Sequence, residues 1–231
     1  MKWRIVGVAG LVGLAASLPA ALAAGGAQQP QTGHGAEAPH MPRHFDDAER
    51  YAKSFDDPGR DDWQMPGRVI ELLDVRAGQT VADVGAGTGY FTVRLARGTP
   101  ARTVYAVDVE PAMVDYVRKR AAAEGLGNVV AVLATANATK LPEPVDLVLV
   151  VNTFHHIPNR VAYFTALRGV MRPRARLAIV DYRKGAAGEG PPEEFRFTPE
   201  QIGDELRRAG FELLARHDFL PRQSFLIFGV P

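Results

Sequence analysis

The chain has 231 residues, 46% of them hydrophobic and 23% charged, which is typical of one globular domain with some additional sequence. The 27 Lys and Arg residues balance 26 Asp and Glu residues, whereas proteins that bind nucleic acid usually carry a basic excess. We therefore expect no nucleic-acid partner. The absence of cysteine excludes disulfides, thiolate metal sites and a cysteine nucleophile.

The N-terminus has the pattern of an export signal. Lys2 and Arg4 precede an uncharged apolar run over residues 5–16, and the small-residue sequence Ala-Leu-Ala follows at residues 21–23. A positive start, a short apolar stretch and an A-x-A site are the three parts of a secretory signal peptide. We predict a signal peptide at 1–23 and a periplasmic protein. The alternative is an uncleaved N-terminal segment that anchors the chain in the membrane.

Residues 24–43 are predicted to form a flexible linker. They are rich in Gly, Ala, Gln, Pro and His and contain almost no large apolar side chain, so they cannot bury enough surface to offset the entropy of ordering. His34, His40 and His44 are irregularly spaced and have no acidic or thiol partner among them, so we expect no metal site there. Residues 44–231 form the predicted domain, which begins with a helical leader at 44–74.

Helices and strands are predicted in chain order from the period of the apolar residues and from the Gly and Pro residues that interrupt it. The leader holds two helices, at 46–55 and 61–73. A regular alternation follows: strand 80–84, helix 88–97, strand 103–107, helix 111–123, strands 129–133 and 145–151, helix 159–171, strand 177–180, helix 199–209, and strands 212–215 and 224–228.

The predicted fold class is α/β. The strands are continuous apolar runs, as expected when helices cover both faces of a parallel sheet. Only a short turn around Pro221 joins the last two strands, which is too short for a parallel crossover. We therefore predict a Rossmann-like, doubly wound sheet that is mostly parallel, with an antiparallel C-terminal strand.

A glycine-rich turn follows the first strand of the alternation. Glycines at 85, 87 and 89 allow the backbone to turn tightly and to approach a ligand, and the helix beyond offers free N–H groups to an anion. A dinucleotide site would need the spacing G-x-G-x-x-G, but Tyr90 occupies the third glycine position. Asp83, two residues before the turn, supplies a carboxylate for a cationic amino group.

Asp108 ends the second strand, about twenty residues beyond the glycines. A carboxylate at that place can accept hydrogen bonds from both hydroxyls of a ribose. The alternative is a helix N-cap, because Pro111 begins the next helix. We favour the ribose role and assign the capping role to Glu110.

With these two signals, the sequence from about Trp63 to the C-terminus resembles the class I S-adenosylmethionine-dependent methyltransferases. The resemblance implies S-adenosylmethionine as the cofactor, bound near the first two strands. Asn137 stands where many members carry an Asp that contacts the adenine amino group, and residues 145–157 resemble the fourth strand and the loop that borders the methyl group. The implied cofactor-binding residues are Asp83, Gly85, Ala86, Gly87, Gly89, Asp108, Val109, Asn137, Ala138 and Asn152.

The candidate catalytic residues lie at the C-terminal ends of two strands, the edge where ligands bind in open α/β sheets. His155 and His156 follow the fourth strand, and one of them could be a general base; the alternative is a histidine that packs under the loop and bonds backbone groups. Asp181 is a second candidate, with a loop cap as its alternative. Tyr51, Phe55 and Trp63 could form an aromatic lid, or simply the core of the leader.

The predicted function is methyl transfer to an unidentified small-molecule acceptor. A second class of function stays open, namely a non-catalytic module that binds S-adenosylmethionine or S-adenosylhomocysteine, because the cofactor is made in the cytosol and the chain carries an export signal. A nicotinamide oxidoreductase is a weaker alternative, against which Tyr90 and Asp83 argue. The oligomeric state has no signature in the sequence.

Overall fold

The computed structural model describes residues 39–41 and 44–231. The predicted signal peptide at 1–23 lies outside these residues, as does all of the predicted linker except 39–41. Within the described ranges, no helix has both the length and the apolar character needed to cross a bilayer.

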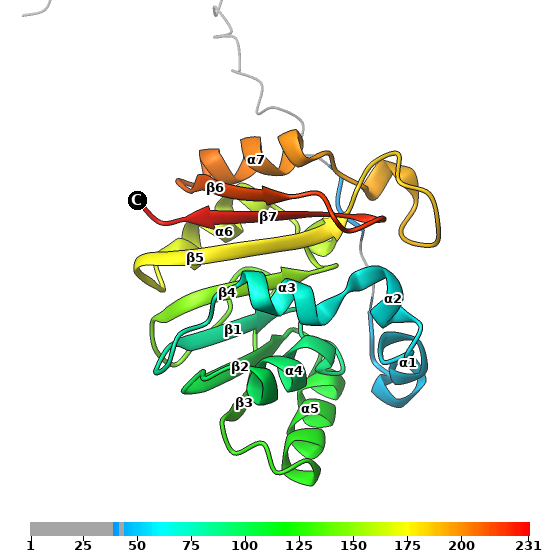
Figure 1. Cartoon of the computed structure of the whole chain (residues 1–231), viewed down its shortest axis with the longest axis vertical. Coiled ribbons are helices and arrows are strands. Elements are labelled where there is room, and N and C mark those ends of the chain that lie inside the picture. Colours follow the sequence, from blue (N-terminus) through cyan, green and yellow to red (C-terminus); the bar gives the residue numbers. More distant parts are fainter. Residues whose placement is uncertain (1–38, 42–43) are drawn as a thin grey trace, which may run out of the picture. The chain divides into compact units, whose positions relative to one another are not determined.

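A seven-stranded sheet forms the centre of the domain, with the strand order β3-β2-β1-β4-β5-β7-β6 (Figure 1). Pairing is parallel from β3 through to β5, and β7 is antiparallel to both of its neighbours, β5 and β6. The predicted mostly parallel α/β sheet with an antiparallel C-terminal strand is therefore confirmed. The strands are β1 Thr80–Val84, β2 Thr103–Asp108, β3 Val129–Leu133, β4 Val145–Val151, β5 Met171–Tyr182, β6 Glu212–His217 and β7 Gln223–Gly229.

Helices cover both faces of the sheet, as the apolar strands require. The alternating side chains of each strand enter two different cores: α6 and α7 pack on one face, and α3 and α4 on the other, where α5 also contacts β2 and β3. The helices are α1 Ala48–Phe55, α2 Arg60–Gln64, α3 Pro66–Leu72, α4 Tyr90–Gly98, α5 Pro111–Ala123, α6 Arg160–Arg168 and α7 Pro199–Arg208, with short 3₁₀ turns η1 Phe154–His156 and η2 Glu193–Phe195.

Two predicted helices differ from the structure. The helix predicted at 61–73 is divided at Met65, which has a left-handed conformation (φ 44°) and is followed by Pro66 at the first position of α3. The helix predicted to reach residue 171 ends at Arg168. Its last predicted residue, Met171, instead begins β5 and pairs with Val145, because apolar residues there serve the sheet and not the helix face.

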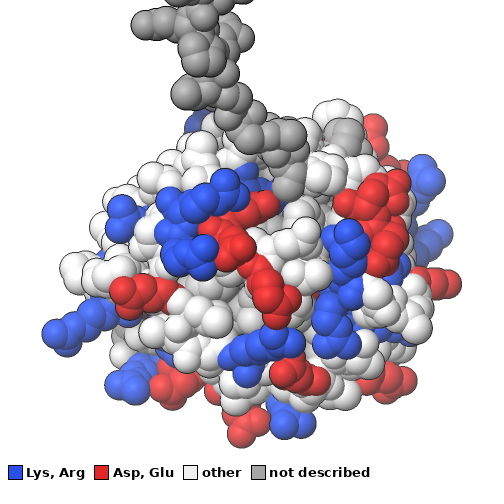
Figure 2. Space-filling view, turned by 90° about the horizontal axis from the view of Figure 1, so that it is seen from above, with Lys and Arg blue, Asp and Glu red and all other residues white. Residues whose placement is uncertain are grey.

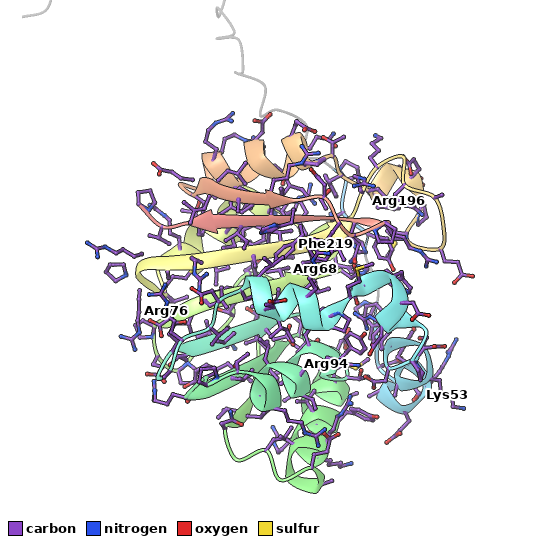
Figure 3. All side chains as sticks on the ribbon, viewed as in Figure 1. Lys53, Arg68, Arg76, Arg94, Arg196 and Phe219 are labelled. Carbon is purple, nitrogen blue, oxygen red and sulfur yellow. The ribbon has the colours of Figure 1, made fainter. Side chains whose placement is uncertain are left out.

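The leader is attached to the sheet domain through charged and aromatic side chains. Arg94 of α4 contacts Asp61 of α2 at 3.0 Å, and its guanidinium lies 3.8 Å from the ring centroid of Tyr90. Arg68 of α3 lies over the ring of Phe219, 4.3 Å from its centroid (Figure 3). The leader is thus packed on the same domain as the glycine-rich turn.

Acidic and basic side chains lie beside one another on the surface. In the face drawn in Figure 2, Lys and Arg are interspersed with Asp and Glu, and no area of that face carries basic residues alone. This mixed surface agrees with the balanced composition.

Candidate functional site

The site lies where the strand order reverses. β1 pairs with β2 on one side and with β4 on the other, so the connections that leave β1 and β4 diverge at the C-terminal edge of the sheet. Ligands of open α/β sheets bind at this switch point. The glycine-rich turn follows β1, and the segment containing His155 and His156 follows β4.

All three glycines of the turn have positive φ, 74° at Gly85, 56° at Gly87 and 86° at Gly89, a region that side chains with a Cβ rarely adopt. Their missing side chains also make room for other parts of the protein. A Cβ on Gly85 would lie 2.1 Å from Oγ1 of Thr153, and one on Gly87 would lie 3.3 Å from the ring of Phe55. Protein atoms therefore already pack against two of the glycines that the sequence assigned to close ligand approach.

Thr88 supplies a polar atom without a partner inside the turn. Its side chain is 1% exposed, and among the described residues its Oγ1 has no hydrogen-bond partner. α4 begins two residues later, at Tyr90, with Gly89 as its N-cap and no side-chain cap. A buried hydroxyl beside uncapped N–H groups suits a polar ligand that completes the turn.

Asp83 is buried beneath the turn. Its carboxylate accepts a hydrogen bond of 2.7 Å from Oγ1 of Thr92, a residue on α4. Burial raises the pKa of Asp83 to about 6, the nearby carboxylate of Asp108 adds to this effect, and the Thr92 hydroxyl and Arg60 oppose it. A cationic amino group beside Asp83 would favour its charged form, so the predicted role fits this environment.

Asp108 ties the ends of three segments together. One carboxylate oxygen accepts from the N–H of Gly87 at 2.8 Å, and the other accepts from the N–H of Glu110 at 3.0 Å. Burial raises the pKa of Asp108, against the effect of these backbone hydrogen bonds. Each oxygen keeps a second lone pair, which leaves acceptor capacity for two hydroxyl groups.

Glu110 does not cap α5 with its side chain, contrary to the sequence-based expectation. It occupies the N-cap position, but its carboxylate instead accepts from the backbone N–H of Phe45 and lies 3.3 Å from Nδ1 of His44. Both partners belong to the segment that precedes α1. Proline at the first position of α5 removes one of the N–H groups that a cap would satisfy, so the side chain is available for the leader.

The predicted adenine segment follows β3 next to Asp108. The N–H of Ala134 donates to the carbonyl of Asp108, and a tight turn closes between Thr135 and Ala138. Asn137 and Ala138 are exposed in this turn. Two apolar side chains are also unusually open there, Val109 at 50% and Leu133 at 47% exposure. Exposed apolar side chains beside a polar turn are suited to contact an aromatic base.

His155 and Asp181 form a buried pair. Nδ1 of His155 lies 2.7 Å from Oδ1 of Asp181, while the other carboxylate oxygen accepts from the backbone N–H of His155. The same carboxylate accepts from the backbone N–H of Tyr182. Asp181 therefore caps the loop, its alternative role, and also contacts the candidate base. Because the carboxylate fixes the proton on Nδ1, Nε2 is the nitrogen that keeps its lone pair.

His156 instead holds the leader. Its Nδ1 donates to the carbonyl of Met41 at 2.7 Å, and the N–H of Met41 donates to the carbonyl of His155. The ring of His156 lies 4.1 Å from that of His155 and 5.6 Å from that of Phe45, measured between centroids. We call residues 39–41 and 44–55 the strap. The strap contacts the loop after β4 and, through Phe45 and Glu110, the start of α5.

The predicted aromatic lid divides into two groups. Tyr51 and Phe55 pack with Phe45 in the strap, at centroid distances of 4.9 and 5.6 Å from the Phe45 ring. Trp63 lies apart from them, against Tyr182 at the end of β5, with a centroid distance of 6.0 Å. The structure therefore does not bring the three predicted aromatic residues together.

Asn152 leaves β4 with a left-handed backbone (φ 53°) and is half-buried. Its Oδ1 accepts a hydrogen bond of 2.6 Å from Nε2 of Gln223 on β7, and the Oε1 of Gln223 accepts one of 3.1 Å from Nε2 of Gln64 on α2. Both glutamines are fully buried. The sequence analysis missed them because they lie 159 positions apart and no local motif joins them.

The arrangement fits S-adenosylmethionine better than a metal ion. The buried carboxylate of Asp83, the half-buried carboxylate of Asp108, an unpartnered hydroxyl and an uncapped helix start offer partners for an amino group, a ribose and a carboxylate. In the parts of the chain that the structure describes, no three His, Asp or Glu residues are grouped in a way that could hold a metal.

Solved structures decide the family. The structure is similar to that of an S-adenosylmethionine-dependent methyltransferase from Aquifex aeolicus, with a TM-score of 0.73 and 30% identity, over 81% of this chain and 100% of that one. The chain belongs to the class I S-adenosylmethionine-dependent methyltransferases. A family model described as a methyltransferase domain also matches residues 81–174, which include the glycine-rich turn, Asp108 and His155.

Curated methyltransferases are also similar to part of the chain. The methyltransferase GfsG of Streptomyces halstedii is 36% identical over 121 residues, which cover 51% of this chain and 43% of that protein. The protein-L-isoaspartate O-methyltransferase of Aeropyrum pernix is 40% identical over 78 residues, 33% of this chain and 30% of that protein. The chain thus spans less than half the length of these two methyltransferases.

Proposed function

We propose that this protein binds S-adenosylmethionine at the switch point and transfers its methyl group to an acceptor that enters beside Asn152 and His155. The observation that supports this most directly is the position of Asp108, whose carboxylate bonds the glycine-rich turn through Gly87 and retains acceptor capacity. In this proposal the ribose lies on Asp108, the amino-acid end near Asp83 and Thr88, and the adenine between Val109 and Asn137.

The chain's own residues then orient the acceptor and remove a proton. S-adenosylmethionine, when bound, supplies an electrophilic methyl group, so transfer depends largely on proximity and alignment. An acceptor that must lose a proton also needs a base, and His155, oriented by Asp181, has Nε2 available for this purpose. His155 is 2% exposed, and the strap covers it through Met41. We infer that the strap shifts when an acceptor enters.

Binding and turnover test the proposal separately. Calorimetry with the purified domain should show binding of S-adenosylmethionine and of S-adenosylhomocysteine, and incubation with candidate acceptors should release S-adenosylhomocysteine. Absence of binding would refute the proposal. Binding of both nucleosides without turnover of any acceptor would favour the non-catalytic binding module.

Export stays a prediction that rests on residues 1–23 and on the residue pattern alone. Mass spectrometry of the protein isolated from its host would report whether this segment has been removed, and would at the same time detect a co-purifying sulfonium nucleoside. An intact N-terminus on membrane-bound protein would favour the anchor.

A further inference from the structure

A chain of three side-chain amides connects the leader with the site. It runs from Gln64 on α2, through Gln223 on β7, to Asn152 after β4. Arg60, one turn before Gln64 on α2, donates from its Nε to Oε1 of Gln64. No part of the fold requires buried amides here, since apolar residues of similar size would fill the same space without needing partners.

The arginine fixes the direction of every hydrogen bond in this chain. A guanidinium has donors and no acceptor, so Gln64 must present its oxygen to Arg60 and its Nε2 to Gln223. Gln223 must then receive with its oxygen and donate to Asn152. Asn152 consequently has its oxygen occupied and its amide N–H groups directed elsewhere.

Asn152 lies between the two halves of the proposed site. Its neighbour Thr153 packs against Gly85 of the glycine-rich turn, and its own N–H donates to the carbonyl of Val180, the residue before Asp181. Among the described residues, nothing accepts a hydrogen bond from Nδ2 of Asn152. Asn152 is half-buried, so a ligand at this edge can reach that donor.

We propose that the Arg60–Gln64–Gln223 chain holds Asn152 as a hydrogen-bond donor to the methyl acceptor, and that the acceptor is a hydroxyl compound. This rests on the proposed methyl transfer. A hydroxyl oxygen has two lone pairs, one that attacks the methyl carbon and one that accepts from Asn152. A neutral amine nitrogen has one lone pair and uses it in the attack, so it cannot do both.

The step balances with groups already described. The acceptor oxygen bonds to the methyl carbon while the bond from that carbon to sulfur breaks, and the electron pair of the broken bond stays on sulfur. The hydroxyl proton passes to Nε2 of His155. Asn152 orients the oxygen and stabilises the negative charge that develops as the proton leaves. Asn152 is thus a catalytic residue, while Gln64 and Gln223 are positioning residues.

Three variants test whether the side-chain amide of Asn152 donates a hydrogen bond to the acceptor. Asn152→Asp replaces the donor with an acceptor of the same shape, Asn152→Ala removes it, and the double variant Gln64→Leu/Gln223→Leu releases Asn152 without leaving a buried amide unpaired. Ser224→Ala is the matched control, because Ser224 is the buried neighbour of Gln223 on β7 and its hydroxyl has no partner among the described residues.

The assay uses phenol and catechol against aniline and ortho-diaminobenzene, with mass spectrometry of the methylated product, and calorimetry for S-adenosylmethionine. We expect methylation of the hydroxyl compounds, with kcat/KM roughly ten- to hundredfold lower in both Asn152 variants. The double variant should lose less than they do, because Asn152 can still turn its amide toward the acceptor. The control should match the parent, and the affinity for S-adenosylmethionine should stay within about threefold throughout.

Failure of this inference can be distinguished from failure of the proposed function. If the parent does not bind S-adenosylmethionine, the proposed function itself is wrong. If the Asn152 variants lose that binding, Asn152 serves the cofactor and the inference is overturned. Methylation of the amines, or of none of the hydroxyl compounds, would overturn it as well.

Discussion

The imidazole of His155 and the carboxylate of Asp181 are joined by a 2.7 Å hydrogen bond between two almost fully buried side chains. The pair links the 3₁₀ turn after β4 to the end of β5, which are neighbouring strands. A buried carboxylate that fixes one imidazole tautomer is the arrangement by which proteins orient a histidine base.

We expect His155→Ala to lower kcat for a hydroxyl acceptor by roughly 10²- to 10⁴-fold, the usual contribution of a general base. Asp181→Asn should lower it less and should change the tautomer, which nitrogen-15 NMR of the ring detects. His217→Ala, in a half-exposed histidine on β6, serves as the control. Full activity in the His155 variant would show that the pair is structural.

Asp108→Ala should weaken S-adenosylmethionine binding by roughly 1–3 kcal/mol, because a charged hydrogen-bond partner is lost. The variant also frees the N–H groups of Gly87 and Glu110, so its fold should be checked by circular dichroism. Asp115→Ala, at an exposed position on α5, is the control. Unchanged affinity in calorimetry would mean that the ribose does not lie on Asp108.

Asp83→Asn should stabilise the protein without cofactor at neutral pH. The pKa of Asp83 is raised to about 6, so folding favours its protonated form, and the charged form destabilises the fold. The stability of the parent relative to the variant should fall as the pH rises from about 4 to about 6 and stay constant above that range. A shift of about two pKa units corresponds to roughly 3 kcal/mol.

Urea unfolding of both proteins across this pH range measures the difference. The same variant should bind S-adenosylmethionine more weakly at pH 7.5, because Asn cannot pair with the cationic amino group. A stability difference that does not change with pH would contradict the assignment of the raised pKa to Asp83.

Gly85→Ala should destabilise the domain by about 2 kcal/mol or more, because its Cβ would lie 2.1 Å from Oγ1 of Thr153 at a backbone with φ 74°. Gly78→Ala is a matched control, since Gly78 has φ 83° but no atom within 4 Å of an added Cβ. The Gly78→Ala control should lose only the stability that a positive φ costs a residue with a Cβ. Adding Thr153→Gly to the Gly85 variant should remove the clash and bring its loss of stability down to that of the Gly78 control, as thermal unfolding would reveal.

Local sequence patterns predicted most of the sheet because its strands are short apolar runs. The bounds predicted for β1, β3, β4 and α5 agree with the structure. The end of α6 could not be predicted in this way: Val170 and Met171 continue the helical period, and only pairing with Val145 places Met171 in a strand. Tertiary contacts thus determined the secondary structure where the local pattern fitted both a helix and a strand.

The site residues also differ in whether local sequence or tertiary contacts bring them together. Asp83 and the glycines share one local motif, and Asp108 ends the strand beside it. His155 and Asp181 likewise follow adjacent strands, so the proximity within each group follows from the fold. The packing of Phe55 on Gly87 and the Gln64–Gln223 hydrogen bond join segments without a common motif, and the pattern of apolar residues carries no information about them.

The strap has a consequence for how the domain can be divided. Its hydrogen bonds reach His155 and His156 at one end and Glu110 at the other, while its last residue, Phe55, lies against Gly87. A truncated protein starting after Phe55 would retain every strand, yet Gly87, Glu110 and the loop after β4 would lose the contacts that the strap makes with them. We expect such a protein to fold but to bind its ligands poorly, so the strap belongs to the working unit.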